Sequence, residues 1–209
     1  NMHILETRLQ RVLGQEKYGK SLIHYAHDMG VLDARAMVIH AIWIDDADIE
    51  LLRASGCSVA HNPVSNLKIG SGVMPFRRLR DAGINICLGN DEATTDDGIN
   101  LWNVIKTAGL VHTIADPEYR QWPQPDELLR AATRGGAVAK CQGADLGFLA
   151  PGCQADFNLI DLNTLAFTPL NDLRQQLVYC ENGSSVVTTV IAGKVVMRTA
   201  PHGTGIIAG

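Results

Sequence analysis

Short apolar runs that each end in a polar residue recur along the first half of this chain, and they constrain its fold most. Such runs end at His40, His61 and Asp91, and amphipathic stretches that stop at a glycine, such as Gly30 and Gly56, separate them. Buried apolar runs that alternate with helices are typical of successive βα units on a parallel sheet. We therefore predict an α/β fold with three full βα units, preceded by the tail of a fourth.

Each of these polar residues falls where a strand meets its loop. The chain begins with a further example, because His3 and Glu6 form a His-x-x-Glu pair in an otherwise apolar stretch. In a β/α barrel the carboxyl ends of the strands meet at one rim, where catalytic groups from different strands converge. Imidazoles and carboxylates on one rim suggest a divalent metal with a proton-transfer group beside it.

Composition and charge exclude several classes of protein. The 209 residues are 46% hydrophobic with a formal net charge of -4, which is typical of a globular chain of one to two domains. No Lys/Arg run indicates a nucleic-acid surface, and no apolar stretch approaches the roughly 20 residues of a membrane helix. The five scattered cysteines contain no Cys-x-x-Cys. We therefore expect a cytoplasmic protein that contacts neither nucleic acid nor membrane.

The parallel part of the chain is too short for a closed barrel. A (β/α)8 barrel needs about eight strands, whereas this chain has four strand ends and opens at Asn1, inside an expected strand. We therefore expect the C-terminal half of a TIM-type barrel over residues 1–146, with the missing N-terminal half upstream. Within this part we expect loops at 62–72 and 91–98 and helices at 99–111 and 126–139.

The sequence pattern changes after Gly143, from alternating strands and helices to short β-rich runs. Short β-rich runs are expected at 157–160, 177–179, 186–191 and 194–197, with a tight hairpin turn at 192–194. We interpret residues 147–209 as a small β-sandwich segment. The Gly-rich residues 199–209 are expected to be extended or loose.

Six short motifs follow one another along almost the whole chain. They are His-Ile-Leu-Glu-Thr (3–7), Val-Ile-His-Ala-Ile-Trp (38–43), His-Asn-Pro-Val-Ser-Asn-Leu-Lys (61–68), Leu-Gly-Asn-Asp (88–91), Gly-Phe-Leu-Ala-Pro-Gly-Cys-Gln-Ala-Asp-Phe (147–157) and Val-Ile-Ala-Gly-Lys-Val-Val (190–196). In this order and spacing they resemble the amidohydrolase superfamily. The resemblance is to its branch of metal-dependent deaminases and chlorohydrolases that act on nucleobases and similar N-heterocycles.

This resemblance implies barrel strands five to eight followed by the β-sandwich. It implies that His3 and Asp91 bind one divalent metal, zinc first and iron as the alternative. It further implies that Glu6 shuttles protons to a ring nitrogen, that His40 hydrogen-bonds the metal-bound water, and that Asp91 also accepts a proton from it. The loops after strands seven and eight would shape the substrate pocket through His61, Asn66 and Glu92.

The chain departs from the family pattern in two places. The His-x-His pair of strand one, which supplies two metal ligands, is absent, and His24, His27, His112 and His202 form no such pair. In addition, Glu92 follows Asp91, where the better-known purine-derivative deaminases tend to have a glycine. The type of substrate ring is therefore not decided among purine, pterin, pyrimidine and triazine.

Each site residue also has a purely structural alternative. A histidine at a strand end, such as His40, can be a hydrogen-bonded interface residue, and Asp91 can be a turn or capping aspartate. His61 precedes Asn62-Pro63 and can fix that loop, while His3 and Glu6 can be a surface pair. The convergence of complementary groups on one rim favours a working site.

Three functions are compatible with these features. The first is metal-dependent hydrolytic deamination of a heteroaromatic base, carried out once the missing half is present. The second is hydrolytic dechlorination of an s-triazine-like ring by the same attack. The third is a non-catalytic fragment that associates with a partner half. We also expect the chain to form a homo-oligomer.

Overall fold

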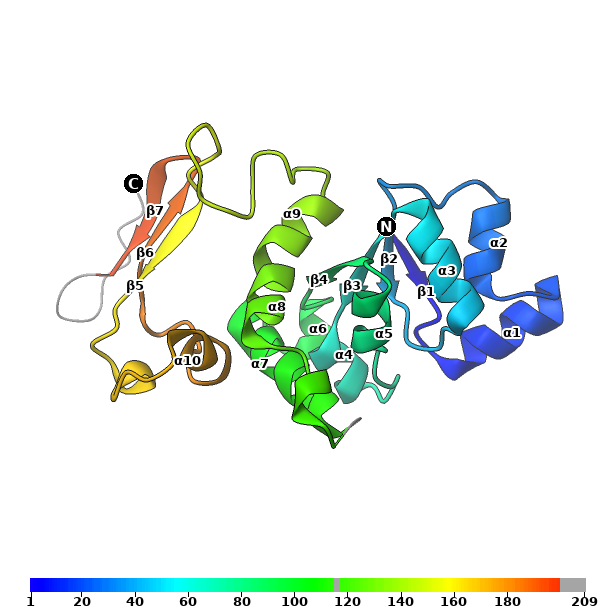
Figure 1. Ribbon diagram of the computed structural model, residues 1–209, viewed down its shortest axis with the longest axis horizontal. Helices are drawn as coiled ribbons and strands as arrows, with labels where there is room; N and C mark the ends of the chain where they lie inside the picture. Colours follow the sequence, from blue (N-terminus) through cyan, green and yellow to red (C-terminus); the bar gives the residue numbers. More distant parts are fainter. Residues whose placement is uncertain (115–116, 200–209) are drawn as a thin grey trace.

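A computed structural model describes residues 1–114 and 117–199 of the chain. Four parallel strands, β1 (Met2–Ile4), β2 (Met37–His40), β3 (Ser58–His61) and β4 (Asn85–Leu88), lie side by side in sequence order. In Figure 1 the parallel sheet lies between α1 to α3 on one side and α7 to α9 on the other. The predicted parallel α/β architecture is confirmed at this level.

Helices follow the strands in the order expected of βα units. They are α1 (Arg8–Tyr18), α2 (Leu22–Asp28), α3 (Asp46–Ser55), α4 (Pro63–Lys68), α5 (Phe76–Asp81), α6 (Ala93–Asp96), α7 (Leu101–Val111), α8 (Pro125–Arg130), α9 (Gly136–Ala139) and α10 (Leu173–Tyr179). A π-helical turn, Ala131–Gly135, joins α8 to α9, and short 3-10 turns occupy His112–Ile114, Tyr119–Gln121 and Leu165–Phe167. No helix in residues 1–114 and 117–199 is long and apolar enough to cross a membrane.

The parallel sheet has two different faces. Val38, Val59 and Ile86 are paired in register on one face and belong to the main core, which α2, α3 and α5 complete. On the opposite face, His3, Ile39, Ala60 and Cys87 form a second row in register. Residues in register on neighbouring strands point to the same side, so His3 shares the face of this second row.

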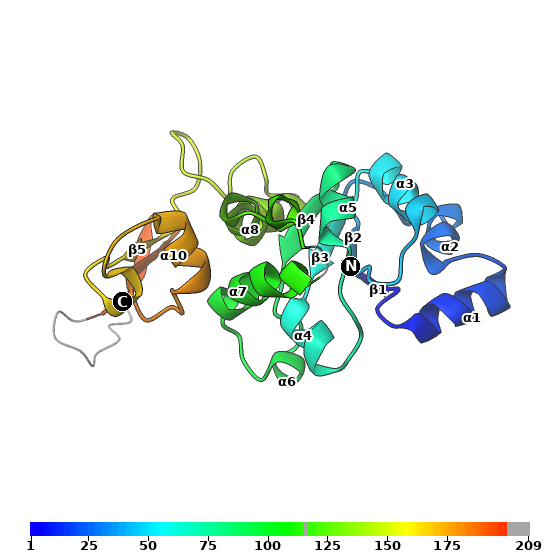
Figure 2. The same ribbon diagram turned by 60° about the horizontal axis from the view of Figure 1, so that its bottom comes forward.

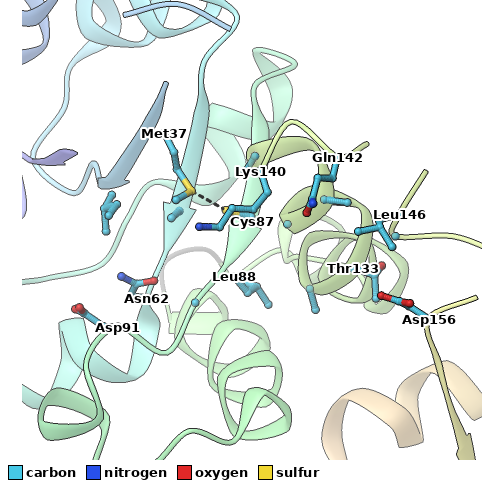
Figure 3. A pocket seen from close by; sticks show the side chains of 18 residues that line it. Met37, Asn62, Cys87, Leu88, Asp91, Thr133, Lys140, Gln142, Leu146 and Asp156 are labelled. Atoms are coloured by element: carbon cyan, nitrogen blue, oxygen red, sulfur yellow. Dashed lines mark hydrogen bonds between the residues drawn. The ribbon is translucent and has the colours of Figure 1, made fainter. Parts of the chain in front are cut away.

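A cavity of about 700 Å³ lies against the second face. Residues of β2 to β4 line one side of it, and the π-helical turn and α9 line the other (Figure 3). Cys87 and Met37 touch in its wall, with 3.6 Å between the two sulfurs. Burial raises the pKa of the Cys87 thiol to about 11, so this thiol is uncharged at neutral pH. The cavity extends to Asp91 at the strand ends.

Two of the expected loops contain short helices. The expected loop at 62–72 holds α4, and the expected loop at 91–98 holds α6. Pro63 stands in the first turn of α4, where its fixed φ favours a helix and its missing N–H is not needed. The Pro, Ser and Asn residues that suggested a loop therefore start a helix here.

The expected strand at 177–179 is wrong, because these residues end α10. Asp172 caps α10 by accepting from the backbone N–H groups of Arg174 and Gln175. Val178 is fully buried against Ile105, Ala108 and Leu128 of α7 and α8. Burial on one helical face thus overrides the β preference of a Leu-Val-Tyr run.

The second sheet is antiparallel and follows residue 147. Its strands β5 (Phe157–Ile160), β6 (Val186–Ile191) and β7 (Lys194–Arg198) lie in the order β5-β6-β7. The predicted hairpin is confirmed, since Ala192 and Gly193 both have positive φ between β6 and β7, as a two-residue hairpin turn requires. The predicted loose tail lies outside the described residues beyond Thr199. In Figure 1 this sheet stands beside α10, away from the parallel strands.

Candidate metal and catalytic site

The carboxyl ends of β1, β2 and β4 bring four of the predicted site residues together. His40 Nε2 lies 3.7 Å from Glu6 Oε2 and 3.7 Å from Asp91 Oδ2. The His3 and His40 ring centroids are 5.2 Å apart. One ligand atom from each of His3, His40 and Asp91 lies within 4.8 Å of the other two. Residues from three separate strands thus surround one small volume.

The backbone at these strand ends adopts an uncommon conformation. Leu5, His40, Ala41 and Asp91 have φ values of 53°, 75°, 47° and 67°. A non-glycine residue in this left-handed region is disfavoured by roughly 1–2 kcal/mol. Such residues cluster at functional sites, where the surrounding contacts hold them in place. At β2 the turn occurs at His40 itself.

His40 is 1% exposed and has a hydrogen-bond partner at one of its two ring nitrogens. Its Nδ1 lies 2.8 Å from Asn66 Oδ1. An amide oxygen only accepts, so Nδ1 carries the hydrogen and donates a hydrogen bond to Asn66 Oδ1. In the neutral ring Nε2 then presents a lone pair to the space between Glu6 and Asp91. That lone pair can accept a hydrogen bond or bind a metal.

Both carboxylates are half-buried and partly committed to neighbours. Asp91 Oδ2 accepts a hydrogen bond from Ser65 Oγ at 2.7 Å, and Asp91 Oδ1 accepts one from the Glu92 backbone N–H at 3.0 Å. Glu6 Oε1 lies 3.4 Å from Ser71 Oγ, which is a long contact. Glu6 Oε2, on the side of His40, stays available for proton transfer.

The donor set fits a divalent transition metal. Two imidazoles and a carboxylate are ligands that zinc takes at about 2.0–2.2 Å, and catalytic zinc sites use three protein ligands with an open position. His3 is exposed, whereas His40 and Asp91 are not, so the cluster opens on the side of His3. This side is where further ligands or a substrate can approach.

The other predicted site residues lie around this cluster at different distances. Asn66 is buried and reaches it through His40. Glu92 is exposed beside Asp91 and stands at the start of α6. His61 is buried, with its Nε2 3.2 Å from Nε2 of His112. Burial lowers the pKa of His112 to about 4 and, helped by the charges of His112 and His40, lowers the pKa of His61 well below its usual value.

Sequence reasoning missed three residues that contact the predicted ones. Ser65 donates to Asp91, Ser71 contacts Glu6 and His112 contacts His61. A helical pattern at 63–68 would have placed Ser65 and Asn66 next to the strand ends. No sequence signal pairs His61 with His112, which is 51 residues away.

Comparisons with known proteins identify similar sequences and structures. A sequence model described as "Amidohydrolase family" matches residues 1–196. The chain is 34% identical to a 5'-deoxyadenosine deaminase of Methanosarcina mazei, over 95% of this chain and 45% of that protein. The structure superposes on a zinc-bound adenosine deaminase from Xanthomonas campestris with a TM-score of 0.89, at 30% identity and over 93% of this chain and 44% of that one.

A chlorohydrolase is also similar in structure. The atrazine chlorohydrolase of Arthrobacter aurescens TC1, complexed with zinc, superposes with a TM-score of 0.86 at 28% identity, over 90% of this chain and 42% of that one. The chain therefore spans about half the length of the curated relatives and solved structures that it matches.

Proposed function

This chain belongs to the amidohydrolase family, and on that premise we propose that it forms part of an enzyme that hydrolytically deaminates a heteroaromatic base. The observation that carries the proposal is the convergence of His3, Glu6, His40 and Asp91 on one volume. The names of the similar proteins, which include deaminases of adenosine derivatives, point to the same reaction class.

We propose one zinc ion, with iron as an alternative, held by His3 and Asp91. Their ligand atoms lie within 4.8 Å of each other and of His40. When bound, such an ion lowers the pKa of a bound water to about 7. The remaining ligands would come from the upstream half of the polypeptide. His40 then orients groups in the site through Nε2, since Asn66 occupies its Nδ1.

Proton transfer falls to the two carboxylates. Deamination adds water to a ring carbon and releases ammonia, so the ring nitrogen must gain a proton before the amino group leaves. Glu6 Oε2 faces the same space as His40 Nε2, and Glu6 would take up a proton there and deliver it to the ring nitrogen. Asp91 Oδ2, 3.7 Å from His40 Nε2, would accept the second proton that the reaction moves.

The substrate would lie on the cavity side of the strand ends, where Asp91 forms part of the wall. Asn66 Nδ2 is buried and has no partner among the described residues. A buried, unpaired donor is costly, which supports a role for Asn66 in binding the ring or another group that completes the site. Glu92 would contact the exposed part of the substrate. His61, whose Nε2 lies 3.2 Å from that of His112, would shape the substrate pocket together with Asn66.

The same proposal includes a partner for the sheet. We infer that residues 1–146 are the C-terminal half of a TIM-type barrel and that residues 147–209 belong to a β-sandwich, with the upstream half completing both. The chain's 45% share of the M. mazei deaminase supports this. A homo-oligomer and a cytoplasmic location are further parts of the proposal, the latter supported by the free cysteines in the described residues.

The test uses the complete polypeptide that contains these residues. Metal content is measured, and ammonia release is followed on a panel of adenosine derivatives, aminopterins, aminopyrimidines and amino-s-triazines. We expect about one zinc or iron per chain and ammonia release from at least one ring class. A metal-free protein, or a metal-loaded one that releases no ammonia from any ring class, would overturn the proposal.

Dechlorination is the second candidate, favoured by the similarity to the atrazine chlorohydrolase. Both reactions replace a leaving group on a ring carbon by oxygen. A chloro-s-triazine in the same panel separates them, because chloride release without ammonia release identifies dechlorination.

A further inference from the structure

We propose that α4 fixes the geometry of the site, with Ser65 and Asn66 as positioning residues for Asp91 and His40. The two neighbouring residues each bond one site residue, and these two site residues come from different strands. The inference rests on the proposed function, since it assigns how that site is held.

The position of α4 next to the strand ends allows its side chains to reach both Asp91 and His40. It follows β3 directly, and β3 pairs with β2 on one side and β4 on the other. Successive residues of a helix point about 100° apart. Ser65 can therefore reach the end of β4 while Asn66 reaches the end of β2. α4 also lies beside α6, the helix that follows Asp91, as Figures 1 and 2 show.

Burial and backbone hydrogen bonds hold α4 itself in place. Ser65 is fully buried and Asn66 is 1% exposed. Backbone bonds tie Asn66 to Asn62 at 3.0 Å and to Ser71 at 2.9 Å. A Cβ added to Gly89 would lie 2.6 Å from Asn62 Oδ1. The end of β4 thus lies directly against the Asn62 side chain at the start of α4, and Asp91 follows within hydrogen-bond reach of Ser65.

The two positioned residues, His40 and Asp91, are among those with left-handed backbones. His40 has a φ of 75° and Asp91 a φ of 67°. Strained residues keep such conformations only where other contacts determine them. The bonds from Ser65 and Asn66 are side-chain contacts of this kind, made at 2.7 Å and 2.8 Å.

Each bond has a specific consequence for the site. Ser65 occupies one lone pair of Asp91 Oδ2, and the Glu92 N–H occupies Oδ1, so the carboxylate cannot rotate and its remaining lone pairs have fixed directions. Asn66 keeps the proton of His40 on Nδ1 and leaves Nε2 unprotonated in the neutral ring. Partners of this type orient ligands and select the tautomer, and their removal typically costs 10–100-fold in metal affinity or activity.

The experiment compares Ser65→Ala and Asn66→Leu with a matched control in the complete polypeptide. The control is Ser58→Ala, which removes a buried serine at the start of β3 whose hydroxyl bonds Asn85 at 2.9 Å. Zinc affinity is measured by competition with a chelator, and the tautomer of each histidine by ¹⁵N NMR of the metal-free protein. The crystal structure of Ser65→Ala reports the Asp91 carboxylate directly. Asn66→Asp serves as the rescue variant, because it keeps an acceptor beside Nδ1.

We expect Ser65→Ala to weaken zinc binding about 10–100-fold and to release the Asp91 carboxylate from its present orientation, while Ser58→Ala changes zinc affinity less than about twofold. Asn66→Leu is expected to abolish the fixed Nδ1–H form of His40, and Asn66→Asp to restore it. Zinc affinity and an Asp91 orientation like those of the unmodified protein in Ser65→Ala would overturn the role of Ser65. An unchanged His40 tautomer in Asn66→Leu would overturn that of Asn66.

These readouts separate the inference from the proposed function. The tautomer and the Asp91 orientation are measured without substrate or metal. If the variants show both changes but the protein deaminates nothing, the positioning role of α4 is supported and the proposed reaction is contradicted. A protein that deaminates and shows neither change would do the reverse.

Discussion

At the scale of single residues, the site depends on short polar side chains whose backbones point them inward at strand ends. Glu6 is the clearest case. It follows Leu5, whose φ of 53° turns the chain out of β1, and its backbone N–H is fixed by Gln10 at 2.8 Å. Its carboxylate is therefore placed beside His40 by local bonds as well as by the sheet. A small change of side chain here should affect chemistry more than folding.

The first prediction concerns this carboxylate. In the complete polypeptide, Glu6→Gln should lower kcat on the order of 10²–10⁴-fold, because an amide cannot take up and deliver a proton. The bound metal should remain, since Glu6 is not one of its proposed ligands. Steady-state rates and metal analysis check this, with Glu16→Gln on the exposed side of α1 as the control. Turnover like that of the unmodified protein would remove Glu6 from its role.

At the scale of elements, α1, α2 and α3 are joined by one buried carboxylate. Asp48 of α3 is fully buried and is bonded by Arg11 of α1 and by Ser21 at the start of α2. Its other role is in the capping box of α3, where it accepts the Asp45 backbone N–H at 3.0 Å. These contacts hold the helices that cover β1, the strand that carries His3.

We predict that Asp48→Asn destabilises the fold by about 2–4 kcal/mol. The estimate follows from losing charged hydrogen bonds and part of a helix cap, and from leaving Arg11 without its buried partner. Urea unfolding of the purified complete protein measures it. Asp46→Asn is the matched control, because Asp46 is on the same helix with a side chain that is 97% exposed, and exposed ion pairs contribute about 0–1 kcal/mol. Equal effects of the two changes would contradict the prediction.

The His61–His112 pair joins β3 to the segment after α7 and should make stability depend on pH. Burial lowers the pKa of His112 from 6.5 to about 4, so the unfolded chain binds protons more readily than the folded one. Stability is then complete above pH 6.5 and falls as the pH drops from 6.5 toward 4. One unit of pKa shift corresponds to about 1.4 kcal/mol, which allows a loss of up to about 3 kcal/mol from this residue.

His112→Gln should flatten the decline in unfolding free energy between pH 6.5 and 4, because glutamine can still bond His61 but does not titrate. Urea unfolding at several pH values measures the slope. Thr113→Ala, next in the chain, serves as the control for local disturbance. If His112→Gln and the unmodified protein lose stability in parallel over this window, His112 does not sense pH.

At the scale of the whole molecule, the parallel sheet has two edges. Within the described residues, β1 pairs only with β2 and β4 only with β3. Apolar side chains are also uncovered beside β1, where Leu9, Val12 and Leu13 of α1 are 63%, 44% and 48% exposed. Unpaired edges and apolar helix faces promote association.

We therefore predict that residues 1–209, expressed alone, are not a monodisperse monomer and deaminate none of the tested rings. Size-exclusion chromatography, metal analysis and the ammonia assay check this. Co-expression with the upstream part of the same polypeptide should yield a defined complex with activity. A monomer of the 209 residues that holds one tight zinc and turns over substrate would show that the strands or the ligands were misassigned.

The sequence alone was sufficient for features that depend on local pattern. The strands that end at His40, His61 and Leu88 and the β6–β7 hairpin follow from apolar runs and turn residues close together in the chain. The meeting of His3, Glu6, His40 and Asp91 also followed, because parallel strands present their carboxyl ends at one edge whatever fills the loops. These parts of the fold and site need no knowledge of distant contacts.

Only the tertiary structure decided the features that depend on distant partners. α10 is helical because Val178 packs against α7 and α8, and His61 bonds His112, which lies 51 residues later in the chain. The left-handed backbones of His40 and Asp91 and their bonds from α4 belong to the same group. Local preferences differ by about 1 kcal/mol or less per residue, so burial and long-range hydrogen bonds settle such cases, and they exist only once the chain has folded.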